Sequence, residues 1–348
     1  MVELVHPPKL RAGDKVAILS PSFAAPAVSP ALHEQALRRL TEATGLVPVE
    51  FPTTRKLGAS PQERAADVNA ALADPEMRAI VTTIGGDDQI RVVPHLDAEA
   101  LRADPKPFLG YSDNTNILNW MWRNGVASFY GGATQVHLGP GPGIDPEHRA
   151  SLTAALLTGD ELEVAEPGES EDFGKDWADP LALTQFGERE PTEPWIWAGP
   201  SRTVTGRTWG GCLEVIDWIA LAGQMPSNND LAGAILLLET SEILPPADNV
   251  RWWVRALGER GTLAALAGVL VARPPASQLH RPRPDAAARA QWRAAQRDAI
   301  IEEISAYNPE AVICIGPPFG HTRPQWIVPY GGEVTLDGEH RRLTAYYR

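Results

Sequence analysis

Short apolar runs alternate with amphipathic segments through the first 150 residues of the chain. Residues 16–20, 46–51 and 79–84 have the composition of strands, and residues 31–44 and 61–73 repeat apolar positions at the helical period. Strands that alternate with helices form a parallel sheet packed against those helices. We therefore predict an N-terminal α/β domain with a parallel sheet, over residues 1–160.

A serine lies where one of these predicted strands gives way to a helix. An apolar run ends at Gly110, and apolar residues recur at helical spacing after Ser112. A serine there projects its hydroxyl from the carboxyl edge of the sheet, beside a helix N-terminus that stabilises developing negative charge. The surroundings differ from the Gly-x-Ser-x-Gly elbow, because Asp113 follows the serine. On this pattern alone Ser112 is a candidate nucleophile or a helix N-cap.

Three further candidates follow predicted strands. Gly85 and Gly86 follow residues 79–84, where paired glycines either let a backbone N–H approach a ligand or form a tight turn. Glu239 ends the apolar run 232–238, a suitable place for a carboxylate that orients a histidine. Among eight histidines only His321 follows a buried strand and a Gly-Pro-Pro-Phe-Gly turn, a rigid loop that suits a catalytic base. No histidine or cysteine cluster indicates a metal, and we expect no cofactor.

The second half of the chain has a different character. Residues 161–200 are acidic and then rich in tryptophan and proline, which predicts a long loop that links two domains. Its tryptophans, Trp177 among them, either cover a core or form a stacking wall for a planar ligand. Residues 201–348 predict a second domain that contains Glu239 and His321 and ends in a small β-rich layer.

The charge and the termini limit the classes of partner and location. A formal net charge of −13 argues against a sequence-independent hold on nucleic acid or on an anionic membrane. No apolar run approaches the length of a membrane span, and the N-terminus has no signal-peptide pattern. Two cysteines are too few for a disulfide framework. These features predict a cytoplasmic protein of the size of an enzyme.

Five motifs occur in order along the chain, namely Thr83-Ile-Gly-Gly86, Gly110-Tyr-Ser-Asp113, Trp209-Gly-Gly-Cys-Leu213, Leu238-Glu239 and Gly320-His321-Thr322. Together they resemble the motifs of the LD-carboxypeptidase family of serine peptidases. The resemblance implies a Rossmann-like N-terminal domain, a smaller β-rich C-terminal α/β domain and an active site in the cleft between them. It also implies a small-molecule or peptide substrate and a homodimer.

The resemblance also assigns roles to individual residues. It makes Ser112 the nucleophile, His321 the general base and Glu239 the carboxylate that orients the base. It places the oxyanion hole at the backbone N–H groups of Gly86 and Asp113, where two donors stabilise the tetrahedral intermediate. Two rivals for the orienting carboxylate remain, Glu242 and Glu214, and Glu214 is also a candidate substrate contact.

The family has two branches, and the sequence looks more like the microcin C immunity peptidases. These enzymes cleave the amide that joins a peptidyl aspartate to a nucleotide-like phosphoramidate, and Trp177 occupies the place of their adenine-stacking tryptophan. The other branch removes the terminal D-alanine of murein tetrapeptides, and that activity stays an alternative. A non-enzymatic alternative is a small-molecule binding protein in which Ser112 only donates a hydrogen bond.

Overall fold

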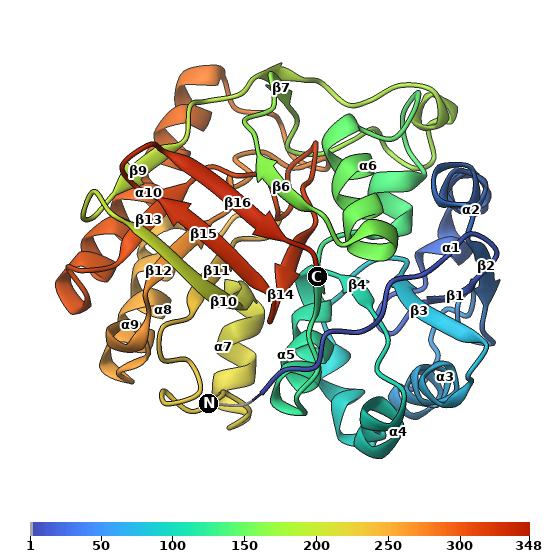
Figure 1. The fold of residues 1–348 in the computed structure, drawn as a ribbon. Helices are drawn as coiled ribbons and strands as arrows, with labels where there is room; N and C mark the ends of the chain where they lie inside the picture. Colours follow the sequence, from blue (N-terminus) through green and yellow to red (C-terminus); the bar gives the residue numbers. More distant parts are fainter. Residues whose placement is uncertain (1–2) are drawn as a thin grey trace.

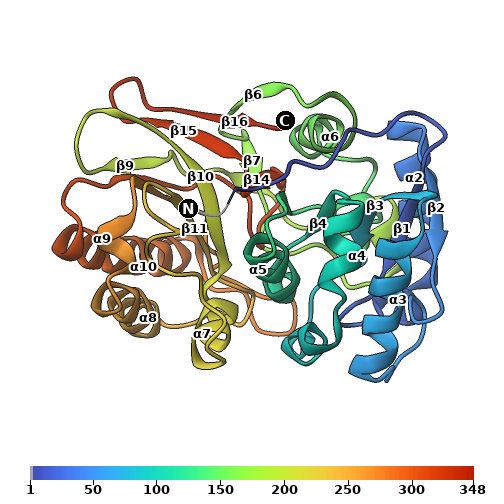
Figure 2. The ribbon, with the colours of Figure 1, turned by 60° about the horizontal axis from the view of Figure 1, so that its bottom comes forward.

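The computed structural model describes residues 3–348 and contains two large β-sheets that lie side by side (Figure 1). The N-terminal half of the chain builds most of one side, and the second half builds most of the other. Helices α5 (Thr115–Arg123) and α7 (Leu213–Leu221) contact each other at the junction of the two sides (Figure 2). The predicted two-part α/β fold is confirmed.

The first sheet has the strand order β14-β5-β4-β3-β1-β2. The pairs within β1 to β5 are parallel, as predicted, whereas β14 joins β5 in antiparallel orientation. The strands are β1 (Lys15–Leu19), β2 (Val47–Glu50), β3 (Met77–Thr82), β4 (Phe108–Gly110), β5 (Ser128–Tyr130) and β14 (Val328–Tyr330).

The helices of the first half begin and end at residues with a local physical reason. Ser60 caps α3 by accepting from the Glu63 N–H, while the Glu63 side chain accepts from the Ser60 N–H. Gly45 ends α2 in the left-handed region, with φ 71°. The helices are α1 (Ala25–Val28), α2 (Pro30–Thr44), α3 (Pro61–Ala73), α4 (Ala98–Ala103) and α6 (Pro146–Thr153), with short turns η1 (Gln89–Arg91), η2 (Val93–His95), η3 (Ser112–Asn114), η4 (Thr134–Leu138) and η5 (Ala154–Thr158).

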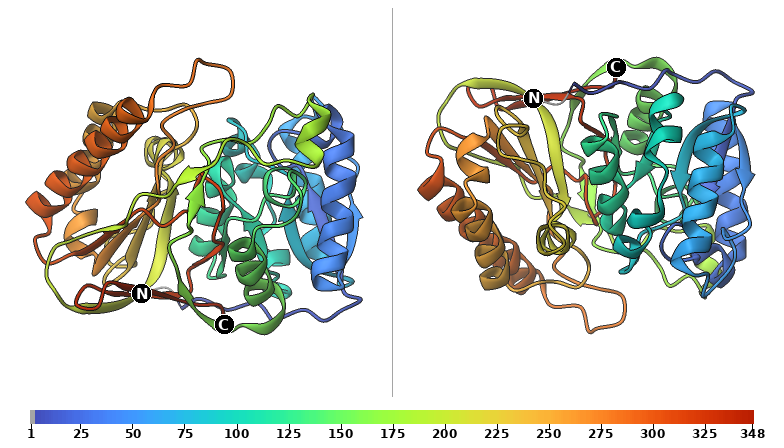
Figure 3. Two further views of the ribbon diagram at one scale, coloured as in Figure 1. Left: turned by 90° about the horizontal axis from the view of Figure 1, so that it is seen from above. Right: turned by 90° about the horizontal axis from the view of Figure 1, so that it is seen from below.

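The second sheet has the order β6-β16-β15-β10-β11-β12-β13-β9 and a parallel centre from β10 to β13. Its strands are β6 (Glu161–Val164), β9 (Ile196–Ala198), β10 (Thr203–Cys212), β11 (Ile235–Glu239), β12 (Gly268–Val271), β13 (Val312–Ile315), β15 (Glu333–Asp337) and β16 (Arg342–Tyr346). The remaining elements are α8 (Ala247–Glu259), α9 (Thr262–Ala265), α10 (Ala286–Tyr307), η6 (Pro180–Leu183) and the hairpin β7 (Glu169–Ser170) and β8 (Glu190–Pro191). Seen from above, α10 and α2 lie at opposite outer sides of the molecule (Figure 3).

The sheets do not follow the predicted boundaries at residues 160 and 200. The segment 161–200, expected to be a loop, supplies both edge strands of the second sheet, β6 and β9. Strand β14 belongs to the last part of the chain and still completes the first sheet. Edge strands are short and carry proline and charge, so their sequence resembles that of a loop.

Apolar side chains of both sheets belong to one continuous buried cluster, which includes Ile18 of β1 and Leu237 of β11. The two halves are therefore packed against each other through a shared core. Among residues 3–348, no helix combines the length and the apolar character needed to cross a bilayer. The cytoplasmic location and the homodimer stay predictions.

Candidate active site

The serine turn, residues 110–115, holds Ser112 in a strained conformation at the carboxyl end of β4. Its φ is 62°, in the left-handed region that residues with a side chain seldom adopt, at a cost of about 1–3 kcal/mol. Both of its backbone groups are held by side chains. The Ser112 N–H donates to the Tyr130 hydroxyl at 3.2 Å, and Thr115 Oγ1 donates to the Ser112 carbonyl at 2.6 Å. Neighbouring side chains thus stabilise a turn that exposes the serine at the sheet edge.

The backbone after β3 lies directly against Ser112. A Cβ on Gly85 would lie 2.8 Å from the Ser112 Cβ and 3.0 Å from its Oγ, so only glycine fits there. The same position would be 3.1 Å from the Asp113 N. No hydrogen-bond acceptor for the N–H of Gly86 or of Asp113 is found within residues 3–348. Two candidate oxyanion donors therefore lie near the serine with their N–H groups uncommitted.

The Asp113 side chain joins the serine turn to the segments that follow β1 and β3. It is fully buried, and its Oδ2 accepts from Ser22 Oγ at 2.5 Å and from the N–H groups of Asp88 and Gln89. Its Oδ1 accepts from Asn116 Nδ2 at 2.9 Å. Burial raises the pKa of Asp113 above its usual value. The aspartate that distinguishes this turn from a Gly-x-Ser-x-Gly elbow therefore connects segments that follow three strands, β1, β3 and β4.

Glu239 and His321 form a close pair at the end of β11. Glu239 Oε2 lies 2.6 Å from His321 Nδ1, and the glutamate side chain has no exposed surface. A Cβ on Gly320 would lie 2.7 Å from that same Oε2, so glycine is needed before the histidine. The structure thus brings together the two residues that the sequence predicted as base and orienting carboxylate.

The other two predicted carboxylates take different positions. Glu242 Oε2 lies 3.1 Å from His321 Nε2, on the opposite side of the imidazole from Glu239. Glu214 does not contact the histidine: its Oε1 accepts from the N–H and hydroxyl of Ser241, and its Oε2 accepts from the Cys212 thiol. Because both oxygens of buried Glu214 are used inside the protein, this geometry does not support the predicted substrate contact.

His321 is therefore bracketed by two carboxylates. Burial acts to lower its pKa, but Glu239 and Glu242 outweigh burial and raise the pKa of His321 to about 9. Its ring packs edge-on against that of Tyr111, with 5.0 Å between the ring centroids. Tyr111 directly precedes Ser112 in the chain. Within residues 3–348 no hydrogen bond joins Ser112 Oγ to His321, because Nε2 faces Glu242. A base that accepts from Ser112 must first lose this contact.

A chain of hydrogen bonds links the backbone of Trp177 to a residue that follows β3. Its carbonyl is 3.5 Å from Ser29 Oγ, and the Ser29 carbonyl accepts from the Gln135 side chain. The Gln135 N–H in turn donates to the carbonyl of Thr83, which is separated from Gly85 by Ile84 alone. Trp177 is half-buried and is not among the described residues packed against the core, unlike Trp195. Covering the core therefore does not explain Trp177.

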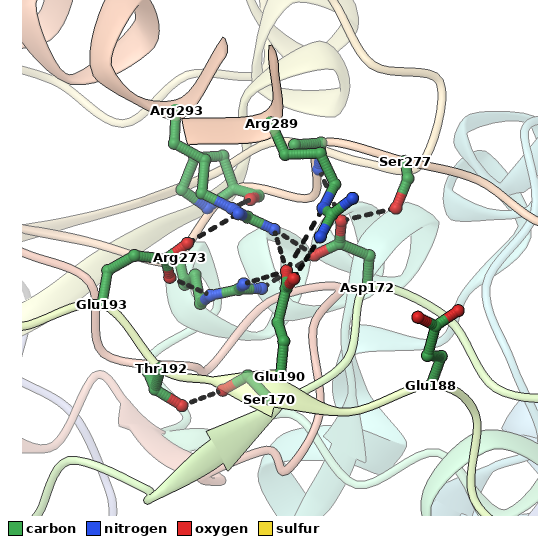
Figure 4. A network of polar contacts seen from close by, with 12 residues as sticks. Ser170, Asp172, Glu188, Glu190, Thr192, Glu193, Arg273, Ser277, Arg289 and Arg293 are labelled. Atoms are coloured by element: carbon green, nitrogen blue, oxygen red, sulfur yellow. Dashed lines mark hydrogen bonds and ion pairs between the residues drawn. The ribbon is translucent and has the colours of Figure 1, made fainter. Parts of the chain in front are cut away.

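A second polar group, the Asp172 cluster, lies where the two ends of the segment 173–189 meet (Figure 4). This segment contains Trp177, and Asp172 and Glu190 flank it in the sequence. Asp172 accepts from Arg273 at 2.8 Å and Arg293 at 2.7 Å, and also from Ser277. Although burial acts to raise it, these guanidinium groups hold the pKa of Asp172 below its usual value. The cluster consists of Asp172, Glu190, Glu193, Arg273, Ser277, Arg289 and Arg293.

Sequence reasoning missed Tyr130 and Asp172. Tyr130 ends a strand and is followed by Gly131-Gly132, just as Gly85-Gly86 follow another strand. This repeated glycine pair is a signal that could have identified the Tyr130 hydroxyl as a candidate site group. Asp172 lies in an acidic stretch that looks like a solvated loop, and its arginine partners are 101 and 121 residues away. No local signal could have identified the Asp172 cluster.

Comparison with known proteins shows matches along most of the chain. Residues 16–131 match the LD-carboxypeptidase N-terminal domain, and residues 205–336 match the LD-carboxypeptidase C-terminal domain. A Vibrio cholerae protein named "Putative carboxypeptidase" is 29% identical over 342 residues, which cover 96% of this chain and 95% of that protein. The microcin C7 self-immunity protein MccF of Escherichia coli is 38% identical over 82 residues, 23% of this chain and 24% of MccF.

Solved structures of MccF share the whole fold. The apo structure has a TM-score of 0.83 at 20% identity, and the alignment covers 98% of each chain. The structure of MccF in complex with aspartyl sulfamoyl adenosine has a TM-score of 0.81 at 21% identity, with the same coverage. At this identity the likeness establishes the fold.

Proposed function

The chain belongs to the LD-carboxypeptidase family, and from that premise we propose that it is a serine hydrolase that cleaves the amide bond of aminoacyl- or peptidyl-nucleotide analogues of the microcin C type. Ser112 acts as the nucleophile, His321 as the general base and Glu239 as the carboxylate that orients it. The observation that carries this proposal is the strained Ser112 turn, which lies next to Tyr111 and the His321–Glu239 pair.

The reaction proceeds through an acyl-enzyme. Ser112 Oγ attacks the carbonyl carbon while His321 Nε2 takes the hydroxyl proton. The oxyanion accepts from the N–H groups of Gly86 and Asp113, and one such donor is worth about 3–4 kcal/mol of transition-state stabilisation. The C–N bond then breaks, and His321 gives its proton to the leaving nitrogen. Water attacks the ester with His321 again as base, which releases the acid and restores Ser112.

Glu242 controls when this cycle can begin. Its carboxylate faces His321 Nε2, the atom that must accept the serine proton. The Glu242 side chain is 63% exposed, so it can turn into water at little cost. We expect substrate binding to coincide with this movement, after which Nε2 can face Ser112.

The position of Trp177 supports the nucleotide class of substrate. The tryptophan is half-buried without belonging to the core, and hydrogen bonds through Ser29 and Gln135 link its backbone carbonyl to Thr83, which follows β3. Stacking of an aromatic side chain on a nucleobase is worth about 1–3 kcal/mol. The MccF complex with aspartyl sulfamoyl adenosine has the same fold, and this agreement favours that molecule as the first substrate to test.

The experiment compares hydrolysis of aspartyl sulfamoyl adenosine with that of a murein tetrapeptide by mass spectrometry. We expect the first to be cleaved with the higher kcat/KM, and we expect Trp177→Ala to lower that value about 10–100-fold. A minimal substrate without the base should be hydrolysed equally by parent and variant. Trp252→Ala, an exposed tryptophan of α8, is the control.

Two results would change the proposal. Preferred cleavage of the tetrapeptide would replace the nucleotide substrate with the murein activity of an LD-carboxypeptidase. Equal losses on substrates with and without adenine, together with a lower melting temperature, would make Trp177 a structural residue.

A further inference from the structure

The Tyr130 hydroxyl lies where the serine turn meets the carboxylate that orients His321. Tyr130 is the last residue of β5 in the first sheet, and its side chain is fully buried. Its hydroxyl oxygen is 2.6 Å from Glu239 Oε1, at the end of β11 in the second sheet. The same oxygen is 3.2 Å from the Ser112 backbone nitrogen. One hydroxyl therefore contacts a residue from each sheet.

The direction of each hydrogen bond follows from the protons available. A backbone N–H can only donate, so the Ser112 N–H donates to the phenolic oxygen. The single phenolic proton is then donated to Glu239, whose ionised carboxylate can only accept. Burial, together with the Glu239 charge, raises the pKa of Tyr130 well above its usual value, so the phenol keeps this proton.

The orientation of the Glu239 carboxylate is fixed because both of its oxygens accept hydrogen bonds. Oε1 accepts from Tyr130, and Oε2 accepts from His321 Nδ1 at 2.6 Å. At the other end, the Ser112 N–H is fixed by Tyr130 in a turn with φ 62°. A shift of Ser112 relative to Glu239 would break one of the two bonds to the hydroxyl.

We propose that Tyr130 is a positioning residue, whose hydroxyl fixes the serine turn relative to the Glu239 carboxylate and so relative to His321. The inference rests on the serine mechanism proposed above. It also explains why the oxyanion hole would use the N–H groups of Gly86 and Asp113: the Ser112 N–H already donates to Tyr130.

The test measures the rate at which a fluorophosphonate labels Ser112, as a function of pH, in the parent, in Tyr130→Phe and in Tyr330→Phe. Tyr330 is a matched control because it is fully buried and its ring stacks on that of Tyr130 at 6.3 Å. Its hydroxyl donates to the Gly210 carbonyl rather than to a carboxylate. The probe reports on the serine without requiring the physiological substrate.

We expect Tyr130→Phe to lower the labelling rate about 10–100-fold, because a small misplacement of the nucleophile is costly. The acid limb of the pH profile should also move to higher pH. A carboxylate that loses a donor stabilises the His321 imidazolium more strongly, which raises the pKa of His321. Tyr330→Phe should change neither quantity. The other groups around His321 are the same in all three proteins, namely Glu242, Glu214, His137 and Tyr111.

A double-mutant cycle isolates the bond to Glu239. In a Glu239→Gln background, Tyr130→Phe should cost clearly less than in the parent, because the partner of the hydroxyl has changed. If Tyr130→Phe does not fold, replacement of Tyr130 by 3-fluorotyrosine tests the same bond. The more acidic phenol donates more strongly to Glu239, so the acid limb should move to lower pH.

The outcomes separate this inference from the proposed function. Parental labelling and an unmoved acid limb in folded Tyr130→Phe, or an unmoved limb with 3-fluorotyrosine, would overturn the role of Tyr130 and leave the serine mechanism intact. A parent that the probe does not label would overturn the serine mechanism, and the role of Tyr130 with it.

Discussion

The Asp172 cluster and the His321 site use carboxylates in opposite ways. The His321 site consists of Ser112, Tyr130, Glu239, Glu242 and His321. In the Asp172 cluster the carboxylates face arginines, which remain charged at any ordinary pH. In the His321 site two carboxylates face one imidazole, which can gain or lose its charge. The type of basic residue that faces the carboxylates, more than burial, therefore separates a cluster that stabilises the fold from one that can exchange a proton.

The largest expected effect is the loss of catalytic activity, without loss of stability, when residues of the His321 site are replaced. Ser112→Ala and His321→Ala should each lower kcat/KM at least about a thousandfold, and the double variant should be scarcely worse, because the residues act as a unit. Ser277→Ala, in the Asp172 cluster, should keep parental activity. Steady-state kinetics with melting temperatures would check this, and Ser112→Ala activity within tenfold of the parent would exclude the serine mechanism.

A second comparison ranks the three glutamates near the histidine. Glu239→Gln should lower kcat about 100- to 10,000-fold, because only Glu239 contacts His321 Nδ1 and fixes its tautomer. Glu242→Gln and Glu214→Gln should be affected less, since one contacts Nε2 and the other contacts Ser241. The three variants are compared by kcat at one pH. Greatest damage in Glu214→Gln would contradict the assignment.

The Asp172 cluster should respond in stability. Asp172→Asn removes the most buried of the carboxylates that Arg273 and Arg293 share, while Glu190 and Glu193 remain beside them. We therefore expect the free energy of unfolding in urea at pH 7 to fall by about 3 kcal/mol, the lower end of the range for a broken buried ion pair. The control is Glu76→Gln, which removes an exposed pair with Lys15 and should cost less than about 1 kcal/mol.

The pH dependence of that loss provides a further check. The pKa of Asp172 is lowered in the folded protein, so its contribution is present above the pKa of an unfolded aspartate, about 3.9, and is lost as pH falls through the folded value. The difference between parent and Asp172→Asn should therefore narrow at acid pH. If Asp172→Asn lowered the free energy of unfolding no more than Glu76→Gln does, the Asp172 cluster would contribute little to stability.

The smallest effect is a shift in the pH profile. The pKa of His321 is raised to about 9, so kcat/KM of the parent should rise with pH up to about that value. Glu242→Gln removes a charge that stabilises the imidazolium, and the acid limb should move to lower pH by up to about one unit, since Glu242 is largely exposed. A limb that moves to higher pH would show that Glu242 does not act on Nε2 in solution.

The sequence predicts local features of this molecule better than distant ones. The parallel sheet follows from the alternation of strand-like apolar runs with segments of helical apolar period. Ser112 is identified by the change from one pattern to the other within a few residues. The pairing of Glu239 with His321, 82 residues apart, needed the family resemblance. Tyr130 reads as an apolar strand residue, and its role depends on a hydroxyl that meets another sheet. The Asp172 cluster depends on arginines that follow β12 or lie in α10, and no hydrophobic pattern in the sequence relates them to residues 161–200.

Strand β14 affects how the protein can be synthesised. Residues 328–330 follow strands β6 to β13 in the chain, so β5 lacks its antiparallel neighbour until all of these strands have been made. An unpaired edge of this kind is a template for aggregation. A fragment ending at residue 160 would keep that edge permanently, and it would also lack Glu239, the partner of Tyr130. The serine turn follows β4, the strand next to β5, so its surroundings are complete only after β14 has been made.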